Sequence, residues 1–169
     1  MILVIISPLF YKVYICTKKR MFSKACEYGI RSCIYIATQS LNSKRPSIRE
    51  IAKEVGSPEP FTAKILQKLV KNNIIESAKG PSGGFFINTE NISKIILRDI
   101  VFSIDGPDIY KNCGLGMKEC SEVKPCPIHN QFKIIKNGLK EMLDTTNLHQ
   151  LTLGLEGGMT FLKTEIEGC

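Results

Sequence analysis

The sequence predicts a mainly α-helical protein with one small β-hairpin, in which a helix-turn-helix is followed by the hairpin and by a long carboxyl-terminal helix. Three observations support this fold class: helical periodicity from Phe22 onward, two closely spaced helix-capping patterns, and a glycine-rich turn between two short apolar runs. The chain has 169 residues, of which 43% are hydrophobic and 23% charged. This ordinary globular composition suits one compact domain.

Residues 1–20 form an apolar segment that ends in basic residues. Its apolar part, about fifteen residues, is shorter than the ~20 that span a bilayer, and its charges follow the apolar run instead of preceding it. We therefore expect no signal peptide or anchor, although a membrane-facing segment remains an alternative. An upstream start codon explains the segment best, so residues 1–20 are treated as a non-native extension with Met21 as the initiator.

The first helix is expected over residues 22–41. Its apolar positions step by four, three, four and four residues, which places them on one face of a helix. Cys26 and Cys33 lie on this stripe, and we interpret both as small buried apolar residues.

Two capping patterns predict the helix-turn-helix. Ser47 and Glu50 have the spacing of a capping box at the start of a short helix over residues 48–55, and Gly56 ends it. Ser57 as N-cap and Pro58 as the first helical residue then open a second helix that runs to about residue 72. The apolar residues expected on its buried face are Phe61, Ile65, Leu66 and Leu69.

A hairpin follows the second helix. Residues 74–78 and 85–87 are expected to be strands, and residues 79–84 form a basic, glycine-rich turn between them. A hairpin in this place is typical of a wing, so residues 21–90 are predicted to be a winged helix-turn-helix DNA-binding region. The glycine run lacks the Gly-Lys-Ser/Thr ending of a phosphate-binding loop, which argues against a nucleotide site.

Charge supports a phosphate-facing surface in this region. The formal net charge is +7, and residues 44–80 contain eight Lys or Arg against four Glu. Such a segment suits contact with DNA phosphates, and a solvated helix face would explain the charge equally well.

The carboxyl-terminal half divides into a connecting helix (residues 91–107), a cysteine loop (108–127), a long helix (128–145) and a short tail (146–169). In the connecting segment, residues 93–104 are expected to be helical and to end before Gly106. The long helix has an apolar heptad seam suited to a partner helix, which a second subunit or the same chain would supply. The seam residues are Ile128, Phe132, Ile135, Leu139 and Met142.

The cysteine loop contains the candidate metal ligands Cys113, Cys120 and Cys126, and His129 follows as a natural fourth ligand. Seven cysteines with three of them clustered indicate a reducing cytosol and metal or redox chemistry, because disulfide-stapled secreted domains have dispersed cysteines. Thiolates select zinc, copper(I) or iron–sulfur units, and the wide spacing favours a two-iron cluster over a short-spaced structural zinc site. A thiol–disulfide switch, a chance meeting of cysteines and a packing role for His129 remain alternatives.

These features resemble the IscR/NsrR-like repressors, the Rrf-two family. The resemblance rests on residues 21–30, the Ser57-Pro58 helix, the hairpin over residues 79–85 and the three-cysteine loop, and it covers residues 21–153. It implies a cytoplasmic homodimer that represses transcription from a roughly palindromic site on double-stranded DNA. It also implies a two-iron, or in some members four-iron, cluster on the three cysteines, with His129 or the partner subunit's Glu27 as fourth ligand. Members of the family sense cluster supply, nitric oxide or redox state.

The residues expected to contact DNA lie on the second helix of the motif, at its flanks and on the hairpin turn. The sequence departs from the family at Ala63, where an acid is usual, and at Lys79, which cannot make the planar bidentate contact of the usual Arg. These departures leave the operator sequence unpredicted. The expected contacts are Arg49, Ser57, Thr62, Lys64, Lys68, Lys79 and Ser82.

Three other functions are alternatives to a cluster-controlled repressor. A cluster-free regulator of the same fold and a zinc-stabilised interaction domain both remain possible on the sequence. An enzyme is not expected, because the sequence shows no paired carboxylates, no Ser/His/Asp set and no phosphate loop, and it has only two histidines, His129 and His149.

Overall fold

The computed structural model describes residues 21–110, 113, 115, 117 and 120–162. In these residues it is mainly helical with a two-stranded antiparallel hairpin, which confirms the predicted fold class. The expectation about residues 1–20 lies outside the described residues. The elements are α1 (Lys24–Leu41), α2 (Ile48–Val55), α3 (Glu59–Lys71), β1 (Glu76–Ala78), β2 (Gly84–Phe86), α4 (Thr89–Ile92), α5 (Leu97–Asp105), the 3₁₀ helix η1 (Pro107–Tyr110), α6 (His129–Thr145) and α7 (Leu148–Glu156).

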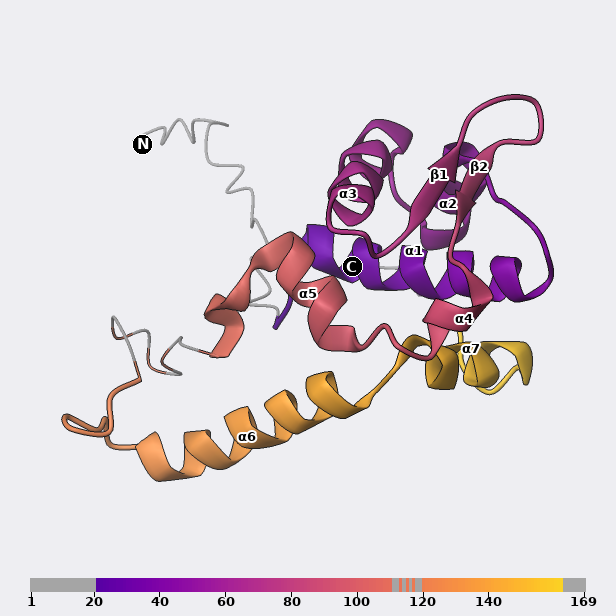
Figure 1. Ribbon diagram of the computed structural model, residues 1–169. Coiled ribbons are helices and arrows are strands. Elements are labelled where there is room, and N and C mark those ends of the chain that lie inside the picture. Colours follow the sequence, from indigo (N-terminus) through magenta and orange to yellow (C-terminus); the bar gives the residue numbers. More distant parts are fainter. Residues whose placement is uncertain (1–20, 111–112, 114, 116, 118–119, 163–169) are drawn as a thin grey trace, which may run out of the picture.

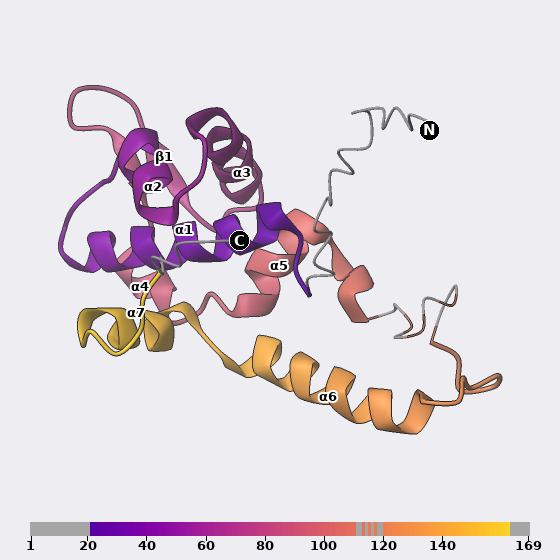
Figure 2. The ribbon, with the colours of Figure 1, turned by 180° about the vertical axis from the view of Figure 1, so that it is seen from behind.

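Helix α1 lies at the centre of the molecule. Helices α2 and α3 and the hairpin lie on one side of it, and α4 and α7 lie on the other, while α6 extends as a long arm beyond α5 (Figures 1 and 2). The predicted stripe of α1 is confirmed, because Cys26, Cys33 and Ala37 are fully buried. The hydrophobic core therefore surrounds one helix, and elements from both ends of the chain complete it.

Helix α2 forms as predicted. The Ser47 hydroxyl accepts from the Glu50 amide, and the Glu50 carboxylate accepts from the Ser47 amide at 2.7 Å, so both halves of the capping box are present. Gly56 ends the helix with a φ of 67°, a left-handed conformation that glycine adopts without strain. Local sequence signals thus define this helix completely.

Helix α3 begins later than predicted. Its N-cap is Pro58, not Ser57. The Ser57 amide instead donates to the Ala52 carbonyl at 2.9 Å, which makes Ser57 part of the end of α2. Its side chain is buried, and the hydroxyl has no hydrogen-bond partner among the described residues. Ser57 is therefore a buried residue of the turn.

The buried face of α3 also differs from the prediction at one position. Ile65, Leu66 and Leu69 are buried as expected. Phe61 is 36% exposed and packs edge-on against Tyr28, with ring centroids 5.9 Å apart.

The hairpin is shorter than predicted and has support from a distant segment. Ser77 pairs with Phe85 in the antiparallel register. The Phe85 amide donates to the Pro46 carbonyl at 2.9 Å, so the loop between α1 and α2 runs along β2. Gly84 makes room for this loop, because a Cβ there would lie 2.4 Å from the Arg45 carbonyl oxygen.

The predicted helix over residues 93–104 is wrong at its beginning. Helix α5 starts at Leu97, and the separate short helix α4 precedes it. The backbone between them is bound by the segment after α6: the Leu97 amide donates to the Thr146 carbonyl at 2.9 Å, and the Leu148 amide donates to the Ile95 carbonyl at 2.8 Å. These bonds engage backbone groups that a continuous helix would use internally. Gly106 ends α5 as expected.

The predicted tail contains a packed helix. Asn147 and Gln150 form a capping box at the start of α7, and Leu148 and Thr152 are buried. Helix α7 packs against α1. The signals for it were present in the sequence as an Asn-x-x-Gln pattern followed by leucines at helical spacing.

None of the described helices combines the length and apolar character needed to cross a membrane.

Candidate functional site

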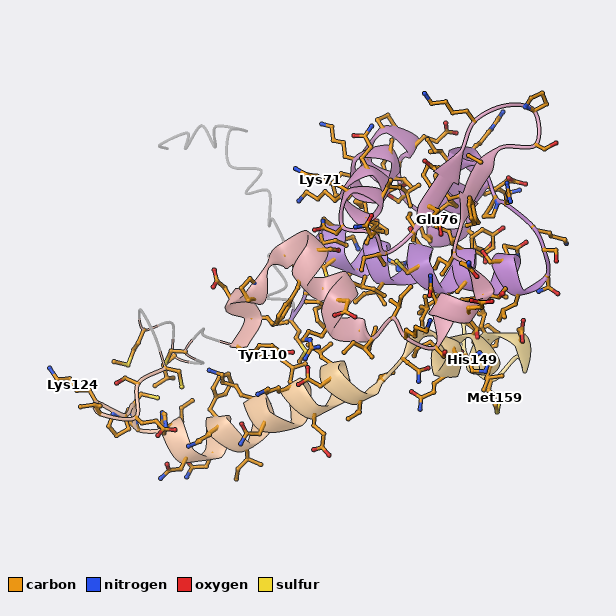
Figure 3. All side chains as sticks on the ribbon, in the orientation of Figure 1. Lys71, Glu76, Tyr110, Lys124, His149 and Met159 are labelled. Carbon is orange, nitrogen blue, oxygen red and sulfur yellow. The ribbon has the colours of Figure 1, made fainter. Side chains whose placement is uncertain are left out.

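The exposed face of α3 is basic. Lys64, Lys68 and Lys71 are all exposed, while the opposite face of the helix is buried. Figure 3 shows Lys71 reaching away from the body of the molecule. Arg49 at the start of α2 is also exposed, with its Nε 3.8 Å from a carboxylate oxygen of Glu59. These side chains form a surface that suits negatively charged phosphates.

The structure divides the predicted DNA contacts into exposed and buried residues. Lys79 and Ser82 are exposed on the hairpin turn, as a wing requires. Thr62 is 1% exposed and its hydroxyl donates to the Pro58 carbonyl at 3.1 Å, and Ser57 is 8% exposed. Because neither buried side chain reaches the surface, we do not retain Ser57 and Thr62 among the candidate DNA contacts.

Lys68 has a contact within the protein. Its Nζ donates to the Ile104 carbonyl at the carboxyl-terminal end of α5, at 3.4 Å. The carbonyls at the end of a helix lack intrahelical partners and attract a cation. Lys68 thus connects the exposed helix of the motif to the element that leads into the cysteine loop.

Arg45 is a basic residue at the hairpin that the sequence prediction did not select. Its guanidinium lies 4.4 Å from the centroid of the Phe86 ring, in a cation–π contact. The prediction placed Arg45 only within a basic segment. Its position beside the hairpin depends on the backbone contact between Phe85 and Pro46, which composition does not reveal.

The four candidate metal ligands form two close pairs. The Sγ atoms of Cys113 and Cys126 are 4.0 Å apart, and Cys120 Sγ lies 3.6 Å from His129 Nδ1. The three thiols are free, Cys113 is 9% exposed and His129 is 7% exposed. The loop thus turns two sulfur atoms toward each other and a third toward the imidazole.

These separations match two ligands on one metal ion. With metal–sulfur bonds of ~2.3 Å and metal–nitrogen bonds of ~2.0 Å, tetrahedral geometry puts two sulfurs ~3.8 Å apart and a sulfur and a nitrogen ~3.5 Å apart. Among the described residues, no three His, Cys, Asp or Glu side chains gather around one point. Each pair therefore has the separation expected of two ligands on one metal ion, such as one iron of a two-iron cluster.

Glu27, the alternative fourth ligand, lies in the first turn of α1. Its carboxylate is 3.1 Å from Lys24 Nζ. Of the two candidates for the fourth ligand, His129 is the one whose ring nitrogen lies next to a loop cysteine in this chain.

The thiol of Cys113 in the loop has a lowered pKa, whereas the thiols of the core have raised ones. Backbone hydrogen bonds from Leu115 and then Met117 lower the pKa of the Cys113 thiol below its ordinary value, and Cys126 and Lys136 add to the effect. A lower pKa favours the thiolate, which is the form that binds metal.

Cys26, by contrast, is a core residue. Burial, followed by the nearby charge of Asp105, raises the pKa of its thiol to about 12. Burial raises the pKa of Cys33 as well. Both thiols therefore stay protonated, which agrees with their prediction as small apolar residues of α1.

An exposed basic helix after a tight turn, with a hairpin beside it, defines a DNA-binding protein of the winged-helix class. Comparison with known proteins narrows this class. Residues 22–153 match the model of the family Rrf2, described as iron-dependent transcriptional regulator. The chain belongs to the Rrf2 family of DNA-binding transcriptional regulators, and it is not an enzyme.

Two curated relatives cover similar parts of the chain. An HTH-type transcriptional regulator of Aquifex aeolicus is 32% identical over 134 residues, which cover 78% of this chain and 90% of the relative. The HTH-type transcriptional regulator IscR of Photorhabdus laumondii is 22% identical over 132 residues, 78% of each chain.

Solved structures agree with the fold. CymR, the global cysteine regulator of B. subtilis, superimposes with a TM-score of 0.66 at 22% identity, covering 78% of this chain and 95% of CymR. The IscR of T. potens gives a TM-score of 0.61 at 18% identity, covering 82% of this chain and 90% of that structure. At these identities the two structures support the fold alone.

Proposed function

We propose that this regulator is a cytoplasmic repressor whose affinity for DNA is set by a two-iron cluster held by Cys113, Cys120, Cys126 and His129. The observation that supports the proposal is the arrangement of these residues in two pairs, at 4.0 Å and 3.6 Å. When bound, such a cluster supplies a redox-active centre that responds to oxidants, nitric oxide or cluster supply.

Helix α3 is the element proposed to enter the major groove. Lys64 and Lys71 project from its exposed face, and Arg49 flanks it. Lys79 and Ser82 on the hairpin turn would meet the backbone or the minor groove beside it. Most of these side chains are suited to contact phosphates, which contribute affinity rather than sequence discrimination.

The carboxyl-terminal end of α5 is the proposed route between the two sites. Ile104 packs so tightly against α1 that a Cβ on Gly29 would lie 2.1 Å from its Cδ1 atom, and its carbonyl accepts from Lys68 of α3. The cysteine loop follows shortly after Ile104 along the chain. A change in the loop is thereby transmitted to the orientation of α3, and couplings of this kind are typically about 1–3 kcal/mol, or 5–150-fold in affinity.

The exposed seam of α6 favours a homodimer. Ile128, Ile135 and Met142 are 39%, 60% and 42% exposed, although the sequence places them on one heptad stripe. An apolar stripe of this kind is suited to packing against the same helix of a second copy. A two-fold dimer would present two α3 helices to a palindromic operator.

Iron analysis combined with DNA titration tests the proposal. The protein is purified without oxygen, and its iron, sulfide and absorption between ~320 and 460 nm are measured. We expect two irons and two sulfides per chain and a difference in operator affinity between the loaded and stripped protein. A colourless protein that stays free of iron and sulfide after reconstitution would contradict the cluster.

A thiol–disulfide switch is the second candidate, because Cys113 and Cys126 face each other at 4.0 Å. An oxidant such as hydrogen peroxide would take two electrons and two protons from the thiols and form the disulfide and water. Cys120→Ala separates the candidates. It removes a cluster ligand, so a cluster-controlled repressor loses iron and regulation, whereas a disulfide switch keeps both cysteines and its response to peroxide.

A further inference from the structure

A pocket with a basic wall lies between η1, the cysteine loop and α6. Its volume is about 230 Å³, and Glu122 of the cysteine loop lies on its wall. Tyr110, Lys133, Lys136, Asn137 and Lys140 also line it. Four of these residues come from one face of α6, and Tyr110 comes from the end of η1. The pocket is therefore built by two elements that the cysteine loop connects.

Three polar groups in the pocket, Lys136, Lys140 and the Tyr110 hydroxyl, form no ion pair or hydrogen bond with the described residues. Lys133 forms a short ion pair with Glu122. Lys136 and Lys140 form no ion pair within the described part of the chain. The Tyr110 hydroxyl is buried and has no hydrogen-bond partner among the described residues. Lys136 is half-buried and Lys140 is exposed, so the Tyr110 hydroxyl is the buried donor of this group, and an acceptor in the pocket would satisfy it.

These lysines lie away from the proposed DNA surface and from the apolar seam of α6. Helix α6 lies on the opposite side of α1 from α3 and the hairpin, which is the side away from the proposed DNA surface (Figures 1 and 2). At about 100° per residue, the pocket lysines are centred roughly 120° around α6 from the apolar seam of Ile135 and Leu139. A partner helix on the seam would thus leave the pocket side open.

We propose that this pocket binds a phosphate group, either as inorganic phosphate or as a small phosphomonoester. The pocket supplies hydrogen-bond donors from two ammonium groups, the Asn137 amide and the Tyr110 hydroxyl. These are more donors than the two oxygens of a carboxylate can use. A phosphate offers a double negative charge and at least three acceptor oxygens. The volume is several times the ~30 Å³ of one water, which leaves room for a small organic group on the phosphate.

The pocket also connects the bound anion to the cysteine loop. Cys120 and His129 contribute to its wall, so the occupant would lie beside the pair of candidate ligands that the loop and α6 bring together. The phosphate donors come from η1 and α6 and not from the cysteines. Anion binding is therefore expected whether or not the chain takes up iron, which separates this proposal from the cluster.

Calorimetric titration of the full-length, metal-free and reduced protein tests the pocket. Inorganic phosphate and glycerol 3-phosphate are titrated separately at constant ionic strength maintained with chloride. We expect saturable binding of one anion per chain. The double variant Lys136→Gln/Lys140→Gln should weaken it about tenfold or more, and Tyr110→Phe about threefold to tenfold.

A matched variant on the other face controls for general charge. Lys64→Gln/Lys71→Gln removes two exposed lysines from α3 and should leave anion binding unchanged, and the melting temperatures of all variants verify that they fold. Tighter binding of glycerol 3-phosphate would identify an ester, and equal or weaker binding would identify free phosphate. Absence of saturable binding, or binding that is lost with the α3 lysines and kept without the α6 lysines, overturns the proposal.

Discussion

Individual residues of this protein set the positions of whole segments, and Gly84 is the clearest case. It has a φ of 149°, and its Cα faces the carbonyl of Arg45. We expect Gly84→Ala to lower the free energy of unfolding by about 2 kcal/mol or more, because the new methyl group meets backbone that cannot move aside easily. Urea denaturation followed by circular dichroism measures the change.

Gly138 provides the matched control for this substitution. It lies within α6, where a Cβ meets nothing within 4 Å. Gly138→Ala should stabilise the protein by up to about 1 kcal/mol, since alanine is the better helix former. Equal effects at the two glycines would contradict the contact between Gly84 and the loop.

The capping box of α2 predicts a pH dependence. Hydrogen bonds from the Ser47 amide and then its hydroxyl lower the pKa of Glu50. A carboxyl group whose pKa is lower in the folded state stabilises the fold above its unfolded pKa, and this stabilisation is lost as the pH falls through the folded value. Ser47→Ala should therefore cost about 1 kcal/mol at pH 7 and less at pH 3. Urea denaturation at both pH values measures it, and an equal cost would show that the Ser47 hydroxyl does not stabilise the Glu50 charge.

Residue-level predictions from the sequence succeeded where the cause is local. The capping box needs only residues 47–50, and the buried cysteines of α1 follow from helical spacing. Ser57 was misplaced because its amide is taken by the Ala52 carbonyl at the end of the preceding helix. Thr62 is buried because one residue of rotation decides whether a side chain on α3 faces the core or the solvent.

At the scale of elements, the last helix is an integral part of the core. Leu148 is 1% exposed at the start of α7, and Leu153 on the same helix is 52% exposed. Leu148→Ala should destabilise the protein by about 2–5 kcal/mol through the cavity it leaves. Leu153→Ala should change stability by about 0.5 kcal/mol or less. Similar losses at the two leucines in urea denaturation would show that α7 does not pack as described.

The link between α3 and α5 predicts an effect on regulation. Lys68→Met removes the hydrogen bond to the Ile104 carbonyl, so it should reduce the ratio of operator affinities between cluster-loaded and stripped protein by about twofold to tenfold. Fluorescence anisotropy with labelled operator measures both affinities. Lys68→Arg, which keeps a donor, should restore most of the ratio.

Lys71→Met is the control for this link, because Lys71 lies exposed on the same helix. It should weaken DNA binding equally in both states. If Lys68→Met does the same, Lys68 acts only as a phosphate contact and the proposed route through α5 is wrong.

Element boundaries were predicted well when neighbouring residues determine them and poorly when distant ones do. The break between α4 and α5 depends on backbone bonds to residues 146 and 148, some fifty positions away along the chain. No periodicity within residues 93–104 reveals those bonds. Helix α7 differs, because its cap and leucine spacing are local signals in a segment that we predict to be a tail.

At the scale of the whole molecule, the arm formed by α6 predicts a dimer. Ile135 lies on the apolar seam and is 60% exposed, and its neighbour Ile134 lies off the seam and is 74% exposed. Ile135→Lys should convert the dimer to a monomer by placing a charge in the interface, whereas Ile134→Lys should leave it intact. Sedimentation velocity at micromolar concentration distinguishes the two. A wild-type protein that sediments as a monomer would rule out the dimer.

The candidate site was predictable in its chemistry but not in its arrangement. The sequence indicated four candidate ligands within one segment, and the structure divides them into the pairs Cys113 with Cys126 and Cys120 with His129. Spacing along an irregular loop does not determine which thiols meet, because glycine and proline allow many paths. The basic pocket was not predictable from the sequence either, because Tyr110 lies close to α6 only in the folded chain.

The packing of α7 against α1 has a consequence for the order of events during synthesis. Helix α1 is among the first described segments to leave the ribosome, and α7 is the last helix. At about 5–20 residues per second, roughly 6–20 s separate them. One side of α1 stays uncovered until α7 arrives, and the cysteine loop leaves the ribosome late in that interval, shortly before α7. The thiols of a nascent chain would thus be able to bind metal before α7 packs against α1. Metal binding at this stage would precede the completion of folding.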